Sequence, residues 1–171
     1  MIRCDVRTYA TMKRLILLLV LSGLLVSGAA AQSTIFIVRH AEKAASGGTD
    51  PNLSVAGQKR AKRLANVLKD AGISKIFVTE FKRTQQTAAP LATALNLTPN
   101  IIPAQNSPLL ITRLRASPGN VLVVGHSNTI PQVIAGLGIT TQIQIGENDY
   151  DNLFVLVRKP PPPRLIHLHY Y

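Results

Sequence analysis

Histidine and arginine residues stand at three points of the sequence where an apolar run ends. Arg39 and His40 follow the apolar run Ile35–Val38, and His126 follows a second run of the same kind. Arg83 lies between them, near the start of a helix pattern. Histidine can attack an electrophile or transfer a proton, and the guanidinium fork of arginine matches the oxygens of an anion. These residue types together indicate chemistry on an anionic phosphoryl group.

Strand and helix patterns alternate along the chain and must position these residues. Strands are expected at 34–38, 75–78, 97–102, 121–124, 153–157 and 165–170, and helices at 54–71, 82–95, 109–116 and 130–135. Ser54 is placed to begin the first helix and Gly72 to end it. Pro90 lies inside the second helix pattern, where proline either kinks or breaks a helix.

Such alternation predicts an α/β fold: a three-layer sandwich with a mostly parallel central sheet and helices on both faces. In open sheets of this class, ligands bind at the carboxyl ends of the strands. The two histidines and Arg39 come directly after strands, and Arg83 lies at a helix start, where N–H groups without partners attract anions. We therefore expect these side chains to meet in one crevice.

Residues 1–31 have the pattern of a secretory signal peptide. Met12 begins a short basic segment, Leu15–Val26 is almost wholly apolar, and small residues lead up to Ala31. The apolar run is shorter than the roughly 20 residues that a membrane-spanning helix needs, although an uncleaved anchor is the alternative. We expect translation to start at Met12, cleavage after Ala31, a periplasmic or secreted protein, and no stable membrane span after cleavage.

Residues 32–171 then form a single domain of ordinary size. The one cysteine, Cys4, precedes this domain, so no disulfide, thiol nucleophile or cysteine-based zinc site is expected in it. Its 15 basic and 7 acidic residues give a net charge of +8, which attracts anions. Basic residues within 59–69 are most simply a solvated helix face. No aromatic residues interleave with them, which disfavours a nucleic-acid partner. The oligomeric state is left open.

Four motifs resemble those of the histidine phosphatase superfamily, also called the phosphoglycerate mutase-like family. They occur in the family's order within residues 35–130. They are similar to its Arg-His motif, its Leu-(Thr/Ser)-x-x-Gly helix opening, its arginine-threonine helix start and its second-histidine motif, at 38–42, 53–58, 83–88 and 125–127 respectively. The resemblance implies the phosphoglycerate mutase-like fold and a phosphatase that uses no cofactor and no metal.

The resemblance also implies a role for each matching residue. His40 would attack phosphorus and form a phosphohistidine, which water then hydrolyses. Arg39 and Arg83 would bind the phosphoryl oxygens, and a protonated His126 would donate to the same oxygens. The substrate would be a small phosphorylated molecule or a phosphorylated protein, carrying a phosphoester or a phosphoramidate.

The proton donor for the leaving group is the departure from the family's pattern. Many members carry an acidic residue downstream of the arginine-threonine helix, but this chain has none from Thr84 to Asn120. Glu42 is a candidate because it is near the first motif, and Asp50 and Glu80 are others. For each of them, an ion pair or a structural role in a loop is favoured over a catalytic acid. Without a strong acid, good leaving groups such as those of phosphohistidine or acyl phosphates are favoured over sugar phosphates.

Other interpretations of the same residues lead to different functions. Asn128 could donate to the anion or cap the following helix. The chain could be a phosphate-ester binding module with a degenerate site, or His40, Glu42 and His126 could hold a metal. Its basic surface could instead bind anionic polymers. An acidic group at 147–151 is interpreted as a loop rim, since it lacks the pattern of a calcium-binding loop.

Overall fold

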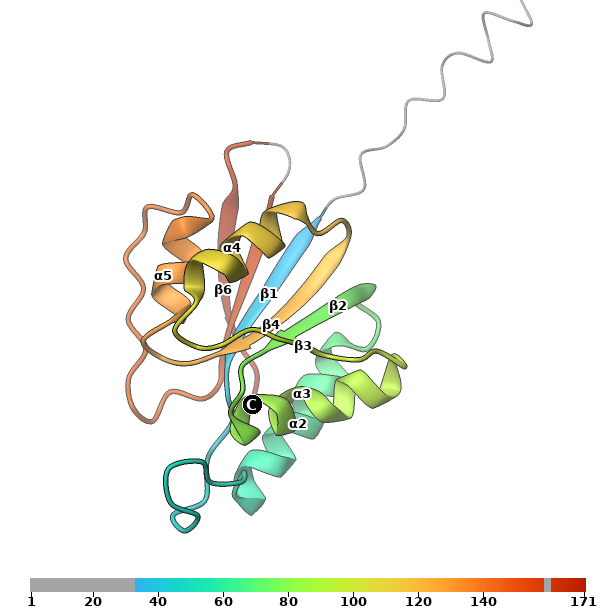
Figure 1. Ribbon diagram of the computed structural model, residues 1–171. Helices are drawn as coiled ribbons and strands as arrows, with labels where there is room; N and C mark the ends of the chain where they lie inside the picture. The colour runs from blue at the N-terminus through green and yellow to red at the C-terminus, as the bar shows by residue number, and fades with distance from the viewer. Residues whose placement is uncertain (1–32, 159–160) are drawn as a thin grey trace, which may run out of the picture. The chain divides into compact units, whose positions relative to one another are not determined.

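The computed structural model describes residues 33–158 and 161–171, so the predicted signal peptide lies outside the described residues. The described chain forms a six-stranded sheet with the order β3-β2-β4-β1-β5-β6 (Figure 1). Its strands are β1 (Thr34–Arg39), β2 (Ile73–Val78), β3 (Asn100–Ile101), β4 (Asn120–Gly125), β5 (Asn152–Val157) and β6 (Arg164–His169).

The sheet is mixed, with a parallel half and an antiparallel edge. Strand β4 pairs in parallel with both β1 and β2, and β2 pairs in parallel with β3. Strand β5 runs antiparallel to β1, and β6 runs antiparallel to β5. Three of these five pairings are parallel, so the prediction of a mostly parallel sheet is confirmed.

Helices cover both faces of this sheet. Helices α2 (Val55–Leu68) and α3 (Lys82–Ala94) lie on one face, and α4 (Ser107–Ala116) and α5 (Ile130–Gly136) lie on the other (Figure 1). Side chains of β1 alternate between the two cores: Ile35 and Ile37 pack with α4 and α5, and Val38 packs with α2 and α3. Burial on both faces explains why this strand is a continuous apolar run. The predicted three-layer sandwich is confirmed.

Local signals place most helix boundaries within a few residues of those expected. The Ser54 hydroxyl accepts a hydrogen bond from the Gly57 amide and begins α2, as predicted. The Asn106 side chain caps α4 and starts it two residues earlier than expected. Helix α3 continues through Pro90, because Leu91 and its neighbours on the buried face pack in the core.

The strand expected at 97–102 is the largest error in the prediction. Only Asn100–Ile101 forms a strand, between Pro99 and Pro103. Proline has no N–H group for a sheet, so a proline on each side restricts pairing to this short edge. In the part of the chain that the structure describes, no helix is long and apolar enough to span a membrane.

The order of the strands brings the carboxyl ends of β2, β4 and β1 next to one another. Thr79, His126 and His40 follow these three ends directly. The His40 amide donates a hydrogen bond of 2.9 Å to the Gly125 carbonyl, which joins the ends of β1 and β4. Residues that are far apart in the sequence therefore share one edge of the sheet.

Candidate active site

A pocket of about 330 Å³ opens at this edge and contains the predicted phosphoryl-binding residues. It is lined by Arg39, His40, Arg83, His126 and Asn128, with further residues from the loops at 43–51 and 104–105. The two histidine rings face each other edge to face, with their centroids 5.4 Å apart. The structure therefore brings together the residues expected to meet.

His40 is buried, with 5% of its surface exposed. Its Nδ1 lies 2.9 Å from the Ala41 carbonyl oxygen, which can only accept, so Nδ1 carries the proton. Desolvation lowers the pKa of His40 to about 4; the Ala41 contact opposes this shift, and His126, Arg83 and Arg39 add to it. At neutral pH the ring is therefore uncharged, with a free electron pair on Nε2.

Helix α3 fixes the backbone that orients His40. The Thr87 hydroxyl accepts a hydrogen bond of 2.9 Å from the Ala41 amide and donates one to the Arg83 carbonyl. Thr87 is fully buried. The threonine thus connects the loop after β1 to the helix that carries Arg83.

His126 is held by a hydrogen bond on each side of its ring. Its Nδ1 lies 3.5 Å from the Arg83 Nη2, and its Nε2 lies 3.0 Å from the Thr79 hydroxyl. Because arginine can only donate, Nδ1 is the acceptor and Nε2 carries the proton. Desolvation, followed by the charges of Arg83 and Arg39, lowers the pKa of His126 to about 4. This ring is therefore also neutral at neutral pH.

Thr79 and Thr84 continue the hydrogen-bond chain from His126 into the protein. The two hydroxyls lie 3.0 Å apart, and Thr84 also donates to the Phe81 carbonyl at 2.9 Å. In this order, the Thr79 hydroxyl accepts a hydrogen bond from the His126 Nε2–H and donates one to the Thr84 hydroxyl. Sequence reasoning missed Thr79, although its position at a strand end was a signal.

The side chain of Arg39 is fixed by a distant turn. Its Nη1 donates to the carbonyls of Gly146 and Glu147 at 2.7 and 2.9 Å, and its guanidinium carbon lies 4.4 Å from the centre of the Tyr150 ring. The Arg39 Nε is buried and has no hydrogen-bond partner among the described residues. A buried N–H group without a partner carries an energetic cost, which an anion at this position would remove. The Tyr150 ring also lies 6.2 Å from that of His40.

Arg83 is positioned by Phe81 and Asp50. Its guanidinium lies 4.2 Å from the Phe81 ring centre, and its Nη1 lies 3.9 Å from the Asp50 carboxylate. Desolvation lowers the pKa of Arg83, an effect that the charges of Asp50 and Glu80 oppose. Asp50 also accepts a hydrogen bond from the Lys82 amide at the start of α3. A carboxylate at this end of a helix stabilises it.

Glu42, the candidate proton donor, has a structural partner in the protein. Arg60 of α2 binds both of its carboxylate oxygens at 2.7–3.0 Å. Burial alone would raise the pKa of Glu42, but the hydrogen bonds from Arg60 and from the backbone lower it overall. Helix α2 approaches the Glu42 backbone so closely at Gly57 that a Cβ there would collide with the Glu42 carbonyl. Glu42 is thus charged at neutral pH, lies outside the pocket lining and has no proton to give.

The other candidate acids also have structural partners. Glu80 accepts a hydrogen bond of 2.8 Å from the Ala104 amide, and Asp50 binds the start of α3 as described above. Neither lines the pocket. Among the described residues, no group of three acidic, histidine or cysteine side chains is arranged to hold a metal. The alternative site of His40, Glu42 and His126 is not formed, since Glu42 is paired with Arg60.

Asn128 lines the pocket and is exposed to solvent. The turn before α5 is closed instead by Thr129, whose hydroxyl accepts a hydrogen bond from the His126 amide at 3.1 Å. The arrangement favours the interpretation of Asn128 as a pocket residue over that of a helix cap.

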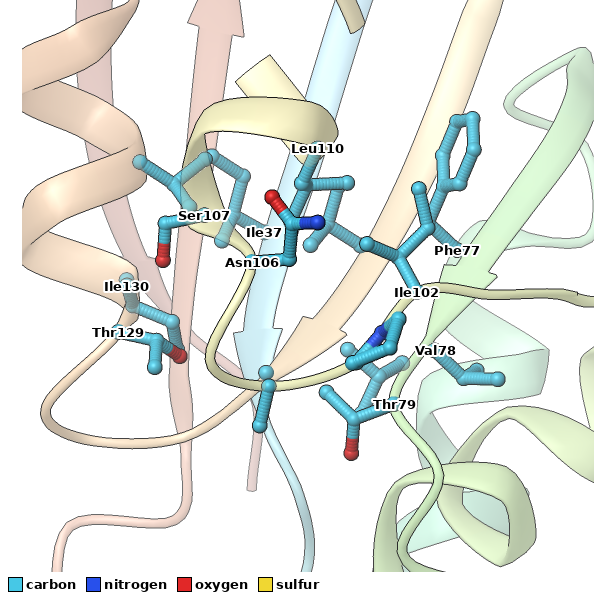
Figure 2. Close-up of a pocket in the computed structure, with 16 residues that line it drawn as sticks. Ile37, Phe77, Val78, Thr79, Ile102, Asn106, Ser107, Leu110, Thr129 and Ile130 are labelled. Atoms are coloured by element: carbon cyan, nitrogen blue, oxygen red, sulfur yellow. The ribbon is translucent and has the colours of Figure 1, made fainter. Parts of the chain in front are cut away.

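A second, mostly apolar cavity lies beside this pocket, beneath the loop before α4 (Figure 2). Ile37, Phe77, Ile102, Leu110 and Ile130 contribute to its walls. Its free volume is about 20 Å³, close to the space that one water molecule needs. The cavity is too small for a substrate, and neither histidine is among its lining residues.

The fold and the pocket define a class: an α/β protein with two neutral histidines and two arginines at the carboxyl edge of its sheet. The model of the histidine phosphatase superfamily (branch 1) matches residues 35–106, which contain Arg39, His40 and Arg83. Over these residues, which are less than half of the chain, the protein is similar to that superfamily.

Similar proteins share the fold over nearly their whole length. An Escherichia coli K-12 protein, described as a candidate alpha-ribazole-5'-P phosphatase, has a TM-score of 0.66 and 18% identity, with 81% of this chain and 96% of that chain covered. The candidate phosphohistidine phosphatase SixA from Agrobacterium tumefaciens has a TM-score of 0.59 and 22% identity, with 79% and 97% covered. At these identities the likeness shows the fold.

One curated relative matches a shorter stretch at higher identity. The PE-PGRS family protein PE_PGRS11 of Mycobacterium tuberculosis is 44% identical over 57 residues, which are 33% of this chain. The match spans about 10% of the length of that relative.

Proposed function

We propose that this chain is an exported phosphatase that hydrolyses a phosphoester or a phosphoramidate through a phosphohistidine on His40, without a cofactor. The observation that carries the proposal is His40 itself: a buried, neutral imidazole whose Nδ1 proton is held by the Ala41 carbonyl, which leaves Nε2 free to attack. A neutral ring nitrogen is the form that a nucleophile requires.

The charged groups around His40 suit a phosphoryl dianion. Arg39, Lys43 and Arg83 line the pocket, and no carboxylate side chain is among its lining residues in the described chain. The buried Nε of Arg39 gains a partner when an oxyanion binds. Several N–H donors directed at one phosphoryl group stabilise the charge that develops as the group is transferred.

The reaction then proceeds in two steps. His40 Nε2 attacks phosphorus, a P–N bond forms, and the bond from phosphorus to the leaving group breaks. Water next attacks the phosphohistidine, the P–N bond breaks, and inorganic phosphate and neutral His40 are released. A bound dianion places negative charge beside His126 and raises its pKa. The ring then takes up a proton from solvent on Nδ1 and, as a cation, donates a hydrogen bond to a phosphoryl oxygen.

Among the described residues, none of those that line the pocket carries a carboxylic acid, and this supports a particular class of substrate. A leaving group that needs no strong acid departs more readily, so phosphohistidine and acyl phosphates are preferred to alkyl and sugar phosphates. The similarity to the Agrobacterium tumefaciens SixA protein, a candidate phosphohistidine phosphatase, supports this preference.

The test combines a substrate panel with chemical trapping. The purified protein and a His40→Ala variant are assayed with p-nitrophenyl phosphate, a phosphohistidine peptide, acetyl phosphate and a sugar phosphate, with and without EDTA. We expect an acid-labile, base-stable phosphoenzyme that His40→Ala lacks, and rates that EDTA leaves unchanged. Equal rates for both proteins would refute the phosphohistidine mechanism.

A phosphate-ester binding module is the second candidate, and the acid-free pocket lining is the observation that favours it. It predicts that inorganic phosphate and orthovanadate bind while no substrate on the panel is turned over. Calorimetric titration of both anions, performed beside the turnover assay, separates the two functions.

Export remains a separate part of the proposal, and the sequence pattern of residues 1–31 supports it. Expression of the full chain in a Gram-negative host should yield a periplasmic product whose mass corresponds to residues 32–171. An uncleaved product in the membrane fraction would contradict export as a free domain.

A further inference from the structure

A compact turn far along the sequence determines how Arg39 is presented to the pocket. The turn Gly146–Tyr150 is closed by Asp149, whose carboxylate accepts a hydrogen bond from the Gly146 amide at 2.8 Å. The Asp149 amide in turn donates to the Gly146 carbonyl at 3.1 Å. A Cβ at Gly146 would lie 2.8 Å from that carboxylate, so the fit is tight.

This turn occupies one edge and one face of the Arg39 guanidinium. The Gly146 and Glu147 carbonyls both accept from Nη1, and the Tyr150 ring covers the face of the group. The Glu147 carboxylate lies 3.8 Å from Nη2, but its side chain is 93% exposed, so it is a weak and replaceable partner. The buried Nε and the Nη2 are the two groups left for a ligand.

The Nε and Nη2 groups point in parallel from one edge of a guanidinium, which is the edge that binds two oxygens of a phosphoryl group at once. A free arginine side chain rotates among many conformations and loses this freedom when it binds. The turn removes the freedom beforehand, since Nη1 and the ring face are already engaged.

We propose that the turn Gly146–Tyr150 is a positioning element that orients the Nε–Nη2 edge of Arg39 toward the phosphoryl group, with Tyr150 and Asp149 as its positioning residues. The proposal rests on the proposed function, because it assumes that the pocket binds a phosphoryl group. Tyr150 acts through Arg39, and it is not among the residues that line the pocket in the described chain.

The alternative role for these contacts is purely structural, with Arg39 serving only to anchor the turn. An anchor would use the donors of the guanidinium for the turn, yet the turn leaves the buried Nε without a partner among the described residues. The alternative predicts that variants of the turn change stability and leave anion affinity as it was.

The test is a double-mutant cycle on the purified protein between Tyr150→Ala and Arg39→Ala. Orthovanadate binding is measured by calorimetry, KM and kcat are measured with p-nitrophenyl phosphate, and thermal unfolding is recorded for each variant. We expect Tyr150→Ala to weaken vanadate binding and raise KM by about tenfold, the loss of about 1.4 kcal/mol in affinity. In the Arg39→Ala background it should have no further effect.

Conservative variants and a matched control complete the design. Tyr150→Phe keeps the ring and should bind vanadate like the wild type, and Asp149→Asn keeps an acceptor for the Gly146 amide and should do so as well. Asp149→Ala should weaken binding as Tyr150→Ala does, which provides a second test if the tyrosine variant does not fold. Tyr171→Ala, at an exposed position with 82% of the residue accessible, should change nothing.

Three results would overturn the inference, and a fourth would refute the proposed function on which it rests. Unchanged vanadate affinity in both alanine variants of the turn would leave the turn a structural role alone. An equal loss from Tyr150→Ala with and without Arg39 would show that the tyrosine contacts the anion itself. A wild-type protein that neither binds vanadate nor hydrolyses any substrate would refute the proposed function, whereas activity that is lost in His40→Ala but kept in Arg39→Ala would refute this inference alone.

Discussion

Replacing Thr79 with valine tests whether a hydrogen-bond chain sets the state of His126. Valine has nearly the shape of threonine but no hydroxyl, so the His126 Nε2–H would lose its acceptor at 3.0 Å. Both residues are buried, with 7% of each exposed. A buried donor without a partner costs about 1–3 kcal/mol. The ring would move its proton to Nδ1, where it meets the donor of Arg83.

We expect this change of tautomer to reduce catalysis, because a His126 ring protonated on Nδ1 can no longer accept the hydrogen bond from Arg83. We expect Thr79→Val to lower kcat by about ten- to a hundredfold, since each factor of ten corresponds to about 1.4 kcal/mol. Steady-state kinetics with p-nitrophenyl phosphate measure kcat, and urea unfolding measures the accompanying loss of stability.

Two further variants make the result specific to the hydroxyl. Thr79→Ser retains the oxygen and should keep most of the activity, while Thr98→Val makes the same change at an exposed position and should have no effect. A Thr79→Val enzyme with wild-type kcat would show that the hydrogen-bond chain does not set the state of His126.

Three other outcomes follow from the same structure. Because the pKa values of His40 and His126 are lowered to about 4 in the folded protein, kcat/KM should persist to pH 5 and fall only as pH approaches 4. The unfolded chain binds these protons near pH 6.5, so the free energy of unfolding should decrease from pH 6.5 to 4, by up to about 3 kcal/mol per histidine. Urea titrations at pH 7 and pH 5 would detect this decrease. The double variant His40→Gln, His126→Gln should have a stability that depends less on pH. Glu42→Gln should lower stability by about 1 kcal/mol through its ion pair with Arg60 and leave kcat unchanged; a large fall in kcat for alkyl phosphates would restore Glu42 as the acid. Glu147→Gln removes a negative charge 3.8 Å from Arg39 and should lower KM about twofold. This effect should disappear in high salt, where charges on the surface are screened.

The layers of the fold could be predicted because both faces of the sheet are buried. Residues of β1 alternate between two cores, and this requires the apolar run that the sequence displays. The short strand β3 could not be predicted in the same way. Its length depends on two flanking prolines and on pairing with β2, which local hydrophobicity does not encode.

The arrangement of the candidate site could be predicted where its residues follow a strand or begin a helix. His40, His126 and Arg83 satisfy this condition, and the structure places them around one pocket. The contacts of Arg39 with Gly146 and Glu147 could not be inferred, since more than 100 residues separate the partners in sequence. The turn contains acidic residues that suggest a loop rim, and only the tertiary structure shows that its carbonyls serve Arg39.

The acidic residues around the pocket share a property that no one of them reveals alone. Glu42 binds Arg60, Glu80 binds the Ala104 amide, and Asp50 binds the start of α3. Each carboxylate accepts hydrogen bonds from a structural element, and none of the three side chains is among the pocket-lining residues of the described chain. Nearby acidic residues therefore increase the order of the cationic pocket without supplying an acid to it. The proposed preference for phosphoramidates and acyl phosphates rests on this arrangement, because no carboxylic acid among the described lining residues can protonate the departing group.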